Sequence, residues 1–357
     1  MISSCCSFSR RSFGISALWV GAVLVLGVGL VGCGGGSDGS AGGPSGSVSV
    51  DGSSTVFPLT EAVAEEFMRA NQGSRVTVGV SGTGGGFSKF LRGETVVNNA
   101  SRPIAPGEIE KAEANGIEFV ELPMAYDGLA VTVHPDNDWV DCLTVEELRQ
   151  IWEPNSEIDN WNQVRDDFPD REIELYGPGT ASGTYDYFTE AIMGESGASR
   201  SDFTASEDDN VLVQGIEGTE AALGYFGLAY YENNADRLKV LGIDPDERGS
   251  GASCVTPSAE TVNDGSYRPL SRPLFIYVNT GRLDETSEAF VDFYLQNVGT
   301  LASDVGYVSM PDSAYALVRQ RFEDRITGTI FGREDIDVTG VQVADILRNA
   351  ARADTTE

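Results

Sequence analysis

Hydrophobic and polar residues along the first part of the chain follow a repeating order of strand, turn and helix. Residues 48–51 alternate between apolar and polar, and apolar residues at helical spacing follow over 59–68. A second apolar strand at 76–80 leads through a glycine-rich turn into helical spacing over 87–91. This order is typical of βαβ units, so the pattern predicts an α/β fold with a mostly parallel sheet.

The rest of the chain continues the same kind of pattern, and its length is sufficient for two domains. Thr144 followed three residues later by Glu147 is a capping-box pattern, which predicts that a helix begins there. Further strands are predicted at 117–120, 128–133, 172–176 and 273–278, and further helices at 148–152, 185–193, 289–295, 313–322 and 341–347.

Three turns share a composition rich in glycine and hydroxyl groups, and each precedes a helical stretch. They cover residues 52–55, 81–86 and 179–184. The first N–H groups of a helix lack partners within the helix, and neighbouring hydroxyls add further donors, so such a turn suits an anion. We therefore predict an oxyanion held where the three helix starts converge; three unrelated helix caps are the alternative.

The first 33 residues have the pattern of an export signal. Arg10 and Arg11 precede an apolar run that ends at Cys33 in a sequence resembling a bacterial lipobox, and a Gly/Ser-rich tether follows over 34–46. The paired arginines also fit a twin-arginine signal. The run is shorter than the roughly 20 apolar residues of a membrane span. We therefore predict lipidation at Cys33, with a transmembrane anchor as the alternative.

The charge of the chain restricts its partners. It carries 24 Lys and Arg against 55 Asp and Glu, a formal net charge of −31. Nucleic-acid binding is therefore not expected. An anion site must also rely on local donors, because the overall field of the protein repels anions.

Cysteine and histidine usage limits the possible chemistry. Cys142 and Cys254 are the cysteines that follow the predicted signal and lipobox, and in an oxidising compartment they are predicted to form a disulfide. The chain contains no CxxC motif, and His134 is its single histidine, so it has no second histidine as a partner. We therefore predict no metal site, no cofactor and no catalytic role for His134.

Five stretches together make the chain resemble the phosphate-binding lipoproteins of bacterial phosphate ABC importers, the PstS type. They are DGSSTVFP at 51–58, GTGGG at 82–86, ASRPI at 100–104, GTASGTY at 179–185 and YRPLSRPL at 267–274. The resemblance implies a two-lobed periplasmic-binding-protein fold of type II, with two mixed sheets flanked by helices. It implies a first lobe of 47–133 plus 271–357 and a second lobe of 134–270, with hinge strands near Val131 and Phe275.

The resemblance also implies which residues bind phosphate. Backbone N–H groups and hydroxyls are expected from the first and second turns, and further donors from the third. The implied set is Ser54, Thr55, Val56, Thr83, Thr180, Ser182, Gly183 and Thr184. The chain departs from many members in having Arg102 where they have Asp, and Pro178 where they have Arg. Arg102 is therefore predicted to supply the cation, because its fork suits an oxyanion; a solvated loop arginine is the alternative.

Selectivity for phosphate over sulfate requires a hydrogen-bond acceptor, because phosphate carries a proton near neutral pH and sulfate does not. Asp127, placed at the edge of a predicted strand, is the candidate acceptor, and a surface turn residue is the alternative. Asp51 and Asp186 come next, because both lie beside donor turns.

The sequence thus predicts an exported, monomeric binding protein that holds inorganic phosphate and delivers it to a membrane permease. A binding protein for sulfate, molybdate or tungstate shares the same turns and is the first alternative. An exported phosphatase or serine hydrolase is a second, disfavoured because the sequence after the tether has no Gly-x-Ser-x-Gly elbow and no metal-ligand cluster. A purely structural surface lipoprotein would not need three donor-rich turns.

Overall fold

The computed structural model describes residues 44–180, 182–206, 208–245, 254–332 and 342–354, all within one compact unit that begins at Gly42. The predicted signal, Cys33 and most of the tether lie outside the described residues. Among the residues that the structure does describe, no helix has the length and apolar character needed to cross a membrane.

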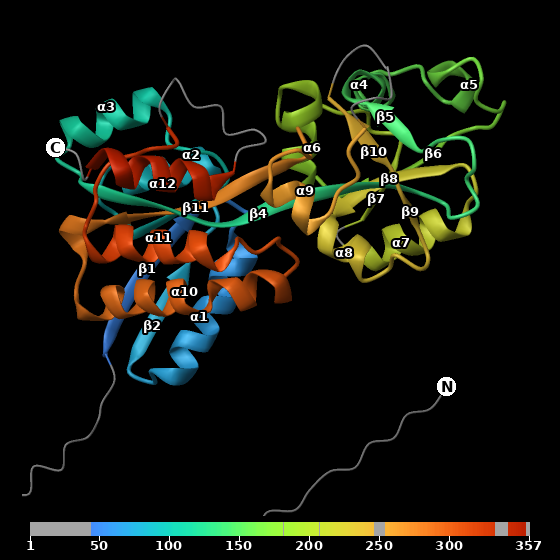
Figure 1. Cartoon of the computed structure of the whole chain (residues 1–357). Helices are drawn as coiled ribbons and strands as arrows, with labels where there is room; N and C mark the ends of the chain where they lie inside the picture. Colours follow the sequence, from blue (N-terminus) through green and yellow to red (C-terminus); the bar gives the residue numbers. More distant parts are fainter. Residues whose placement is uncertain (1–43, 181, 207, 246–253, 333–341, 355–357) are drawn as a thin grey trace, which may run out of the picture. The chain divides into compact units, whose positions relative to one another are not determined.

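The strands and helices alternate along the chain (Figure 1). The strands are β1 (Gly46–Gly52), β2 (Ser74–Val78), β3 (Val97–Ala100), β4 (Phe119–Val133), β5 (Cys142–Thr144), β6 (Glu174–Pro178), β7 (Thr204–Ser206), β8 (Ala222–Gly227), β9 (Lys239–Val240), β10 (Gly242–Asp244) and β11 (Ser271–Asn279). The helices are α1 (Phe57–Ala70), α2 (Gly82–Phe90), α3 (Pro106–Ala114), α4 (Val145–Trp152), α5 (Trp161–Val164), α6 (Gly183–Met193), α7 (Asp209–Gly218), α8 (Leu228–Glu232), α9 (Ala259–Asn263), α10 (Glu285–Asp304), α11 (Asp312–Glu323) and α12 (Val343–Asp354), with a 3₁₀ turn at Thr280–Arg282.

The main sheet has the strand order β2-β1-β3-β11-β4-β8-β6-β7, and β9 also pairs with β4. The parallel pairing predicted from the sequence holds in the outer parts, where β1 lies between β2 and β3 and β6 lies between β7 and β8. The central strands β4 and β11 run antiparallel to each other, so the sheet is mixed.

Strand β4 corrects one prediction. The separate strands expected at 117–120 and 128–133 are a single strand of 15 residues, and every one of its residues is buried. Residues 119–128 run along β11, with a register shift that leaves Met124 without a partner on that strand, and residues 129–133 pair with β8. Pro123, Asp127 and Gly128 resemble turn residues in the sequence, but burial and pairing with β11 keep this segment extended. The alternative that Asp127 is a surface turn residue is therefore wrong.

A buried carboxylate fixes the C-terminal segment to the start of β4. Glu121 accepts hydrogen bonds from the hydroxyls of Tyr277 and Thr329, at 2.7 and 2.6 Å, and from the N–H groups of Ile330 and Phe331, at 2.8 and 3.0 Å. Four donors offset the cost of burying this carboxylate. The segment after α11 is thus bound to the pair of strands formed by β4 and β11.

Two glycines allow the first two hydroxyl-rich turns to approach each other. Gly52 has φ +140°, a conformation that side chains rarely adopt, and ends β1. Gly86 lies in α2, where an added Cβ would overlap the Cα of Gly52 and the Oδ1 of Asn98. The start of α2 can therefore pack directly on the turn after β1.

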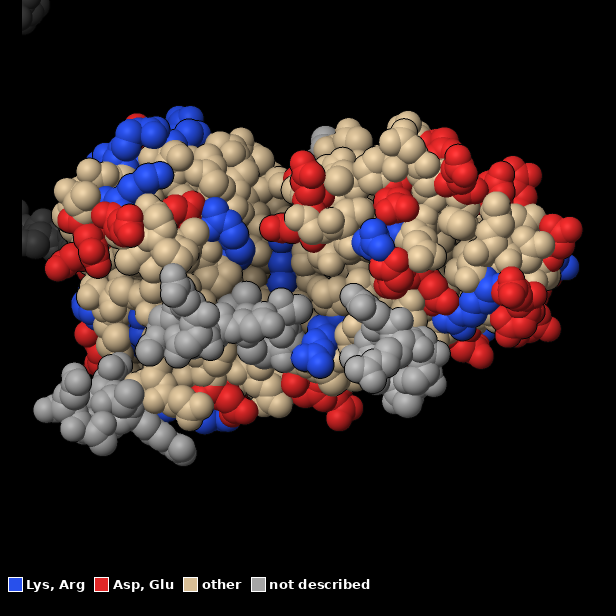
Figure 2. All heavy atoms as spheres, turned by 90° about the horizontal axis from the view of Figure 1, so that it is seen from above, with Lys and Arg blue, Asp and Glu red and all other residues tan. Residues whose placement is uncertain are grey.

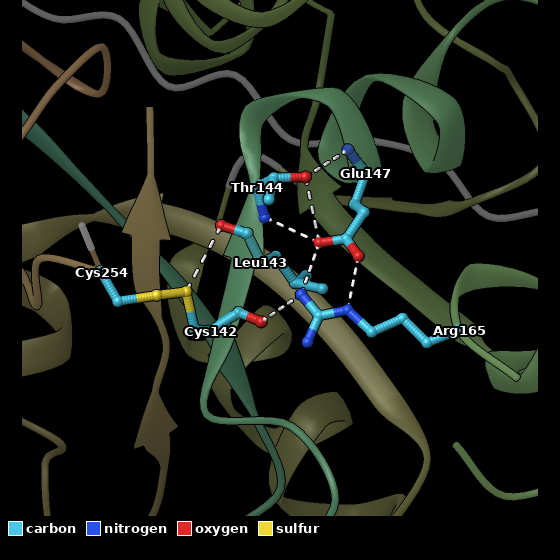
Figure 3. Close-up of a disulfide and its surroundings, with 6 residues drawn as sticks. All are labelled: Cys142, Leu143, Thr144, Glu147, Arg165 and Cys254. Carbon is cyan, nitrogen blue, oxygen red and sulfur yellow. Dashed lines mark hydrogen bonds and ion pairs between the residues drawn. A yellow bond between two sulfur atoms is a disulfide. The ribbon is translucent and has the colours of Figure 1, made fainter. Parts of the chain in front are cut away.

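The predicted disulfide between Cys142 and Cys254 is present and joins residues 112 positions apart (Figure 3). The carbonyl of Cys142 accepts a hydrogen bond from Arg165 at 3.1 Å, and Arg165 also pairs with Glu147. Glu147 in turn accepts from the N–H of Thr144 and donates its own N–H to the hydroxyl of Thr144. The capping box predicted at Thr144 is thus confirmed, and it lies beside the disulfide.

Loss of the disulfide should lower the free energy of unfolding. In the chain-entropy model, closing a loop of this length stabilises a protein by about 5 kcal/mol. The double variant Cys142→Ser/Cys254→Ser should lose about this amount in chemical denaturation. A reducing agent should destabilise the wild type but leave the double variant unchanged. Equal stability of the two proteins without reductant would contradict the expectation.

The contact between the first two turns leads to a second expectation. Gly86→Ala should cost about 1–3 kcal/mol of unfolding free energy, because the new methyl group must push α2 away from Gly52. Gly84→Ala is the matched control, since an added Cβ there meets no atom within 4 Å. Denaturant unfolding of both variants measures the difference. A Gly84 variant as destabilised as the Gly86 variant would show that the contact has no special role.

Candidate functional site

A cavity of about 210 Å³ brings together residues that are far apart in the sequence. Its wall comes from the turn after β1, the start of α2, the segment after β3, helix α6 with the segment after it, and the start of β11. The lining residues are Ser53, Ser54, Thr55, Gly82, Thr83, Ser101, Arg102, Asp186, Glu190, Ser196 and Arg272. Figure 2 shows basic side chains at the bottom of a hollow, on a face where acidic side chains are otherwise frequent.

The third turn lines a neighbouring cavity of about 360 Å³, through Ser182, Gly183 and Thr184. Ser54 and Thr55 line both cavities, so they lie between the second and third turns. The contact is close, because a Cβ added to Gly183 would lie 2.5 Å from the Oγ1 of Thr55. The structure therefore brings the three turns together around Thr55.

The turn after β1 offers unused backbone donors. Among the described residues, none accepts a hydrogen bond from the N–H groups of Ser54, Thr55 or Val56. These groups immediately precede the first residue of α1, where the partial positive charge of a helix N-terminus adds to them. At the third turn, Ser182 caps α6 by accepting from the N–H of Thr184 at 3.2 Å. The first turn can thus donate to an anion directly.

Thr83 and Arg102, two of the predicted phosphate-binding residues, lie on the wall of the cavity, and each has a partner within the protein. Thr83 shares a hydrogen bond of 3.0 Å with the hydroxyl of Ser101, which leaves a hydroxyl pair facing the cavity. Arg102 donates to both carboxylate oxygens of Glu108, at 2.8 and 2.9 Å. This pairing raises the pKa of Arg102 and directs its fork toward α3. The guanidinium of Arg102 is therefore engaged by Glu108.

Arg272 is the cation that the sequence interpretation missed. It lies on β11, and its Nη2 donates to Thr55 Oγ1 at 3.2 Å. Its guanidinium lies 3.7 Å from the ring centroid of Tyr187, on α6. The side chain is only 12% exposed and lines the cavity. The stretch 267–274 contained this arginine, but nothing in the sequence showed that it faces the first turn.

Asp127 lies behind Arg272 and does not line the described cavities. The two residues are opposite each other in the β4–β11 pairing, with 3.6 Å between Asp127 Oδ2 and Arg272 Nε. Burial raises the pKa of Asp127, and Arg272 opposes that rise. Asp127 therefore holds Arg272 from behind, and an anion in the cavity would meet Arg272 first.

The other two candidate acceptors have different surroundings. Asp51 pairs with Lys89 at 2.6 Å and accepts a hydrogen bond from Ser81, so it fastens the second turn to β1. Asp186 lines the cavity from the first turn of α6. Of the predicted donors, Thr180 is exposed and lies outside the described cavities.

No metal site is evident in the part of the chain that the structure describes, because no three His, Cys, Asp or Glu residues gather in a suitable group. His134 accepts a hydrogen bond from the N–H of Asp136 at 3.0 Å, within its own turn. The chemistry of the cavity is therefore that of hydroxyls, N–H groups, two guanidinium groups and two carboxylates.

Known proteins share this sequence and fold. The PBP superfamily domain matches residues 39–298. Protein SphX of Synechocystis sp. is 47% identical, over 85% of this chain and 90% of that protein. The phosphate-binding protein PstS of Staphylococcus saprophyticus is 40% identical, over 88% of this chain and 94% of that protein.

Solved structures agree with these relatives. A possible phosphate binding protein from Planctomyces limnophilus has a TM-score of 0.73 and 45% identity, covering 78% of this chain and 98% of its own. An ABC-type phosphate transport receptor from Vibrio cholerae, at 22% identity and a TM-score of 0.60, shares the fold. The fold is thus the two-lobed type II periplasmic-binding-protein fold. The chain belongs to the PBP superfamily and, within it, to the PstS-type phosphate-binding proteins.

Proposed function

We propose that this protein binds inorganic phosphate outside the cytoplasm and delivers it to the permease of an ABC importer. The observation that carries the proposal is the cavity in which hydroxyls, free N–H groups and Arg272 converge from separate segments. The relatives that match most of the chain support it, since they are named phosphate-binding proteins. The same relatives make the protein a binding protein and not an enzyme.

The donors of the cavity suit a tetrahedral oxyanion. Ser54, Thr55 and Val56 would donate N–H groups, Thr83 a hydroxyl, and Arg272 its guanidinium. The start of α6, at Ser182, Gly183 and Thr184, would complete the shell from the other side of Thr55. Charge-assisted bonds from a guanidinium are the strongest of these. Arg102 lines the same wall and would add charge without leaving Glu108.

The carboxylate of Asp186, in the wall of the cavity, suits a protonated oxyanion better than sulfate. A carboxylate accepts the proton of phosphate, whereas it repels sulfate, which has no proton to donate. Asp186 lies beside the third turn, so we assign the acceptor role to Asp186 in place of Asp127.

The proposed lobes are residues 47–133 with 271–357, and residues 134–270. Strands β4 and β11 would connect them, since each lies next to one boundary. An anion bound in the cavity would contact both lobes. It would favour a closed state, because the closed state makes more contacts with the anion.

The attachment to the membrane is part of the same proposal. Residues 1–33 would direct export, Cys33 would carry the lipid, and residues 34–46 would tether the protein near the permease. The protein would act as a monomer and would need no cofactor.

Calorimetry on the soluble part of the chain, from Gly42 onward, tests the ligand. Phosphate should bind at one site per chain, and sulfate and molybdate should bind more weakly. Binding of sulfate, molybdate or tungstate at least as tight as that of phosphate would replace phosphate with another oxyanion as the ligand.

The two arginines of the wall should contribute unequally to the affinity for phosphate. Arg272→Gln should weaken phosphate binding by about 100-fold, because it removes a nearly buried guanidinium that faces the donors. Arg102→Gln should weaken it by about 10-fold or less, because Arg102 is half-exposed and paired with Glu108. Calorimetry measures both, and circular dichroism checks folding. A larger loss for Arg102 would return the main role to that residue.

Substitutions of Asp186 and Asp127 should affect the binding of phosphate and sulfate differently. Asp186→Asn should weaken phosphate binding and strengthen sulfate binding, because the amide neither repels sulfate nor accepts as well. Asp127→Asn should weaken both anions alike, because it acts on them only through Arg272. Competition binding measures the ratio of the phosphate affinity to the sulfate affinity. A ratio that changes in Asp127→Asn but not in Asp186→Asn would restore Asp127 as the acceptor.

A further inference from the structure

Arg272 has two carboxylates around it, and they differ in depth. Asp127 is buried behind the guanidinium, as part of β4. Glu190 lies on α6, and its Oε2 is 3.5 Å from Nη1 of Arg272. The side chain of Glu190 is 53% exposed. One carboxylate is thus fixed in place, and the other is free to turn toward water.

Glu190 lines the cavity, but it has no role among the proposed phosphate donors. Glu190 lines the anion cavity and also a neighbouring cavity of about 290 Å³, and Arg272 lines both. Glu190 therefore lies at the edge of the guanidinium that faces open space. A negatively charged side chain at that edge opposes an incoming anion and competes with it for the same N–H groups.

The formal charges around Arg272 indicate how Glu190 and an incoming anion compete for its guanidinium. Arg272 with Asp127 is close to neutral, and Glu190 brings the group to about −1 before any anion arrives. An oxyanion that carries one or two negative charges must replace Glu190 at Nη1 or accept its repulsion. Exposed and half-exposed pairs are worth up to about 1 kcal/mol, so Glu190 can be displaced at modest cost. Asp127 cannot leave, because burial holds it under the guanidinium.

We propose that Glu190 is an internal counter-anion of Arg272, which the bound oxyanion displaces and which thereby sets the affinity of the site. The proposal rests on the proposed function, because the displacing anion is phosphate. Glu190 is then a residue that lowers affinity, in contrast to the donors around it. It keeps the guanidinium oriented toward the cavity while no ligand is bound.

The test is calorimetry of phosphate binding to the wild type and to Glu190→Gln. The amide keeps the shape of the side chain and removes the charge, so phosphate should bind about 3- to 10-fold more tightly. Glu190→Asp keeps the charge and should therefore gain less phosphate affinity than Glu190→Gln. Glu195→Gln is the matched control, because Glu195 lies just after α6 and outside the described cavities, and its affinity should stay unchanged.

Salt dependence gives a readout that a purely structural role would not change. Added sodium chloride should reduce the gap between the wild type and Glu190→Gln, because ions screen the repulsion that Glu190 exerts. Unchanged or weaker phosphate binding by Glu190→Gln would overturn the proposal. A gain of the same size in Glu195→Gln would overturn it as well, because the effect would then come from net charge alone.

A second measurement separates this proposal from the proposed function. Sodium sulfate should raise the melting temperature of Glu190→Gln more than that of the wild type, because sulfate takes the place that Glu190 leaves. Failure of the wild type to bind phosphate would overturn the proposed function only. Equal sulfate effects on the two proteins would overturn the counter-anion role, whatever the natural ligand is.

Discussion

The antiparallel pairing of β4 with β11 is the constraint on which the rest of the structure depends. Its register places Arg272 opposite Asp127, at the point where β4 changes partner from β11 to β8. The same pairing places Tyr277 opposite Glu121, whose buried carboxylate binds the C-terminal segment. A shift of one residue would turn Arg272 to the other face of the sheet. The cation of the site and the anchoring of the C-terminal segment are therefore set together.

Convergence of the turns has a second physical cause, the absence of side chains where backbones meet. Gly52 and Gly86 let the first two turns touch, and Gly183 lets the third approach Thr55. Local donors gathered in this way would oppose the field of a chain with net charge −31. The acidic residues that remain in the wall are few and placed at one side, on α6. Selectivity can thus come from acceptors within a site that is otherwise built from donors.

The sequence was sufficient to predict the features that depend on local chemistry. The three turns, the capping box at Thr144 and the Cys142–Cys254 bond each follow from neighbouring residue types or from elimination, and the structure contains them. The helices expected after the second and third turns are present, but α2 begins at Gly82, so residues 82–86 belong to the helix and not to a turn before it. Helix α6 begins at Gly183, two residues before the predicted start.

Features that depend on register and burial could not be predicted in this way. Arg272 looks like any arginine of a proline-rich stretch until β11 is paired with β4. The turn-like residues Pro123, Asp127 and Gly128 concealed a continuous strand, because the sequence does not show their burial or their pairing with β11. The partner of Arg102 was also hidden, since Glu108 becomes its neighbour only through the start of α3.

A crystal structure of residues 42–357 with phosphate would test the central claim most directly. The account predicts one phosphate between the turn after β1 and Arg272, with N–H donors from Ser54 to Val56 and contacts from the start of α6. It also predicts that Glu190 has moved away from Nη1 of Arg272. A phosphate bound elsewhere on the surface, or one within the cavity that leaves Arg272 without contact, would contradict the account.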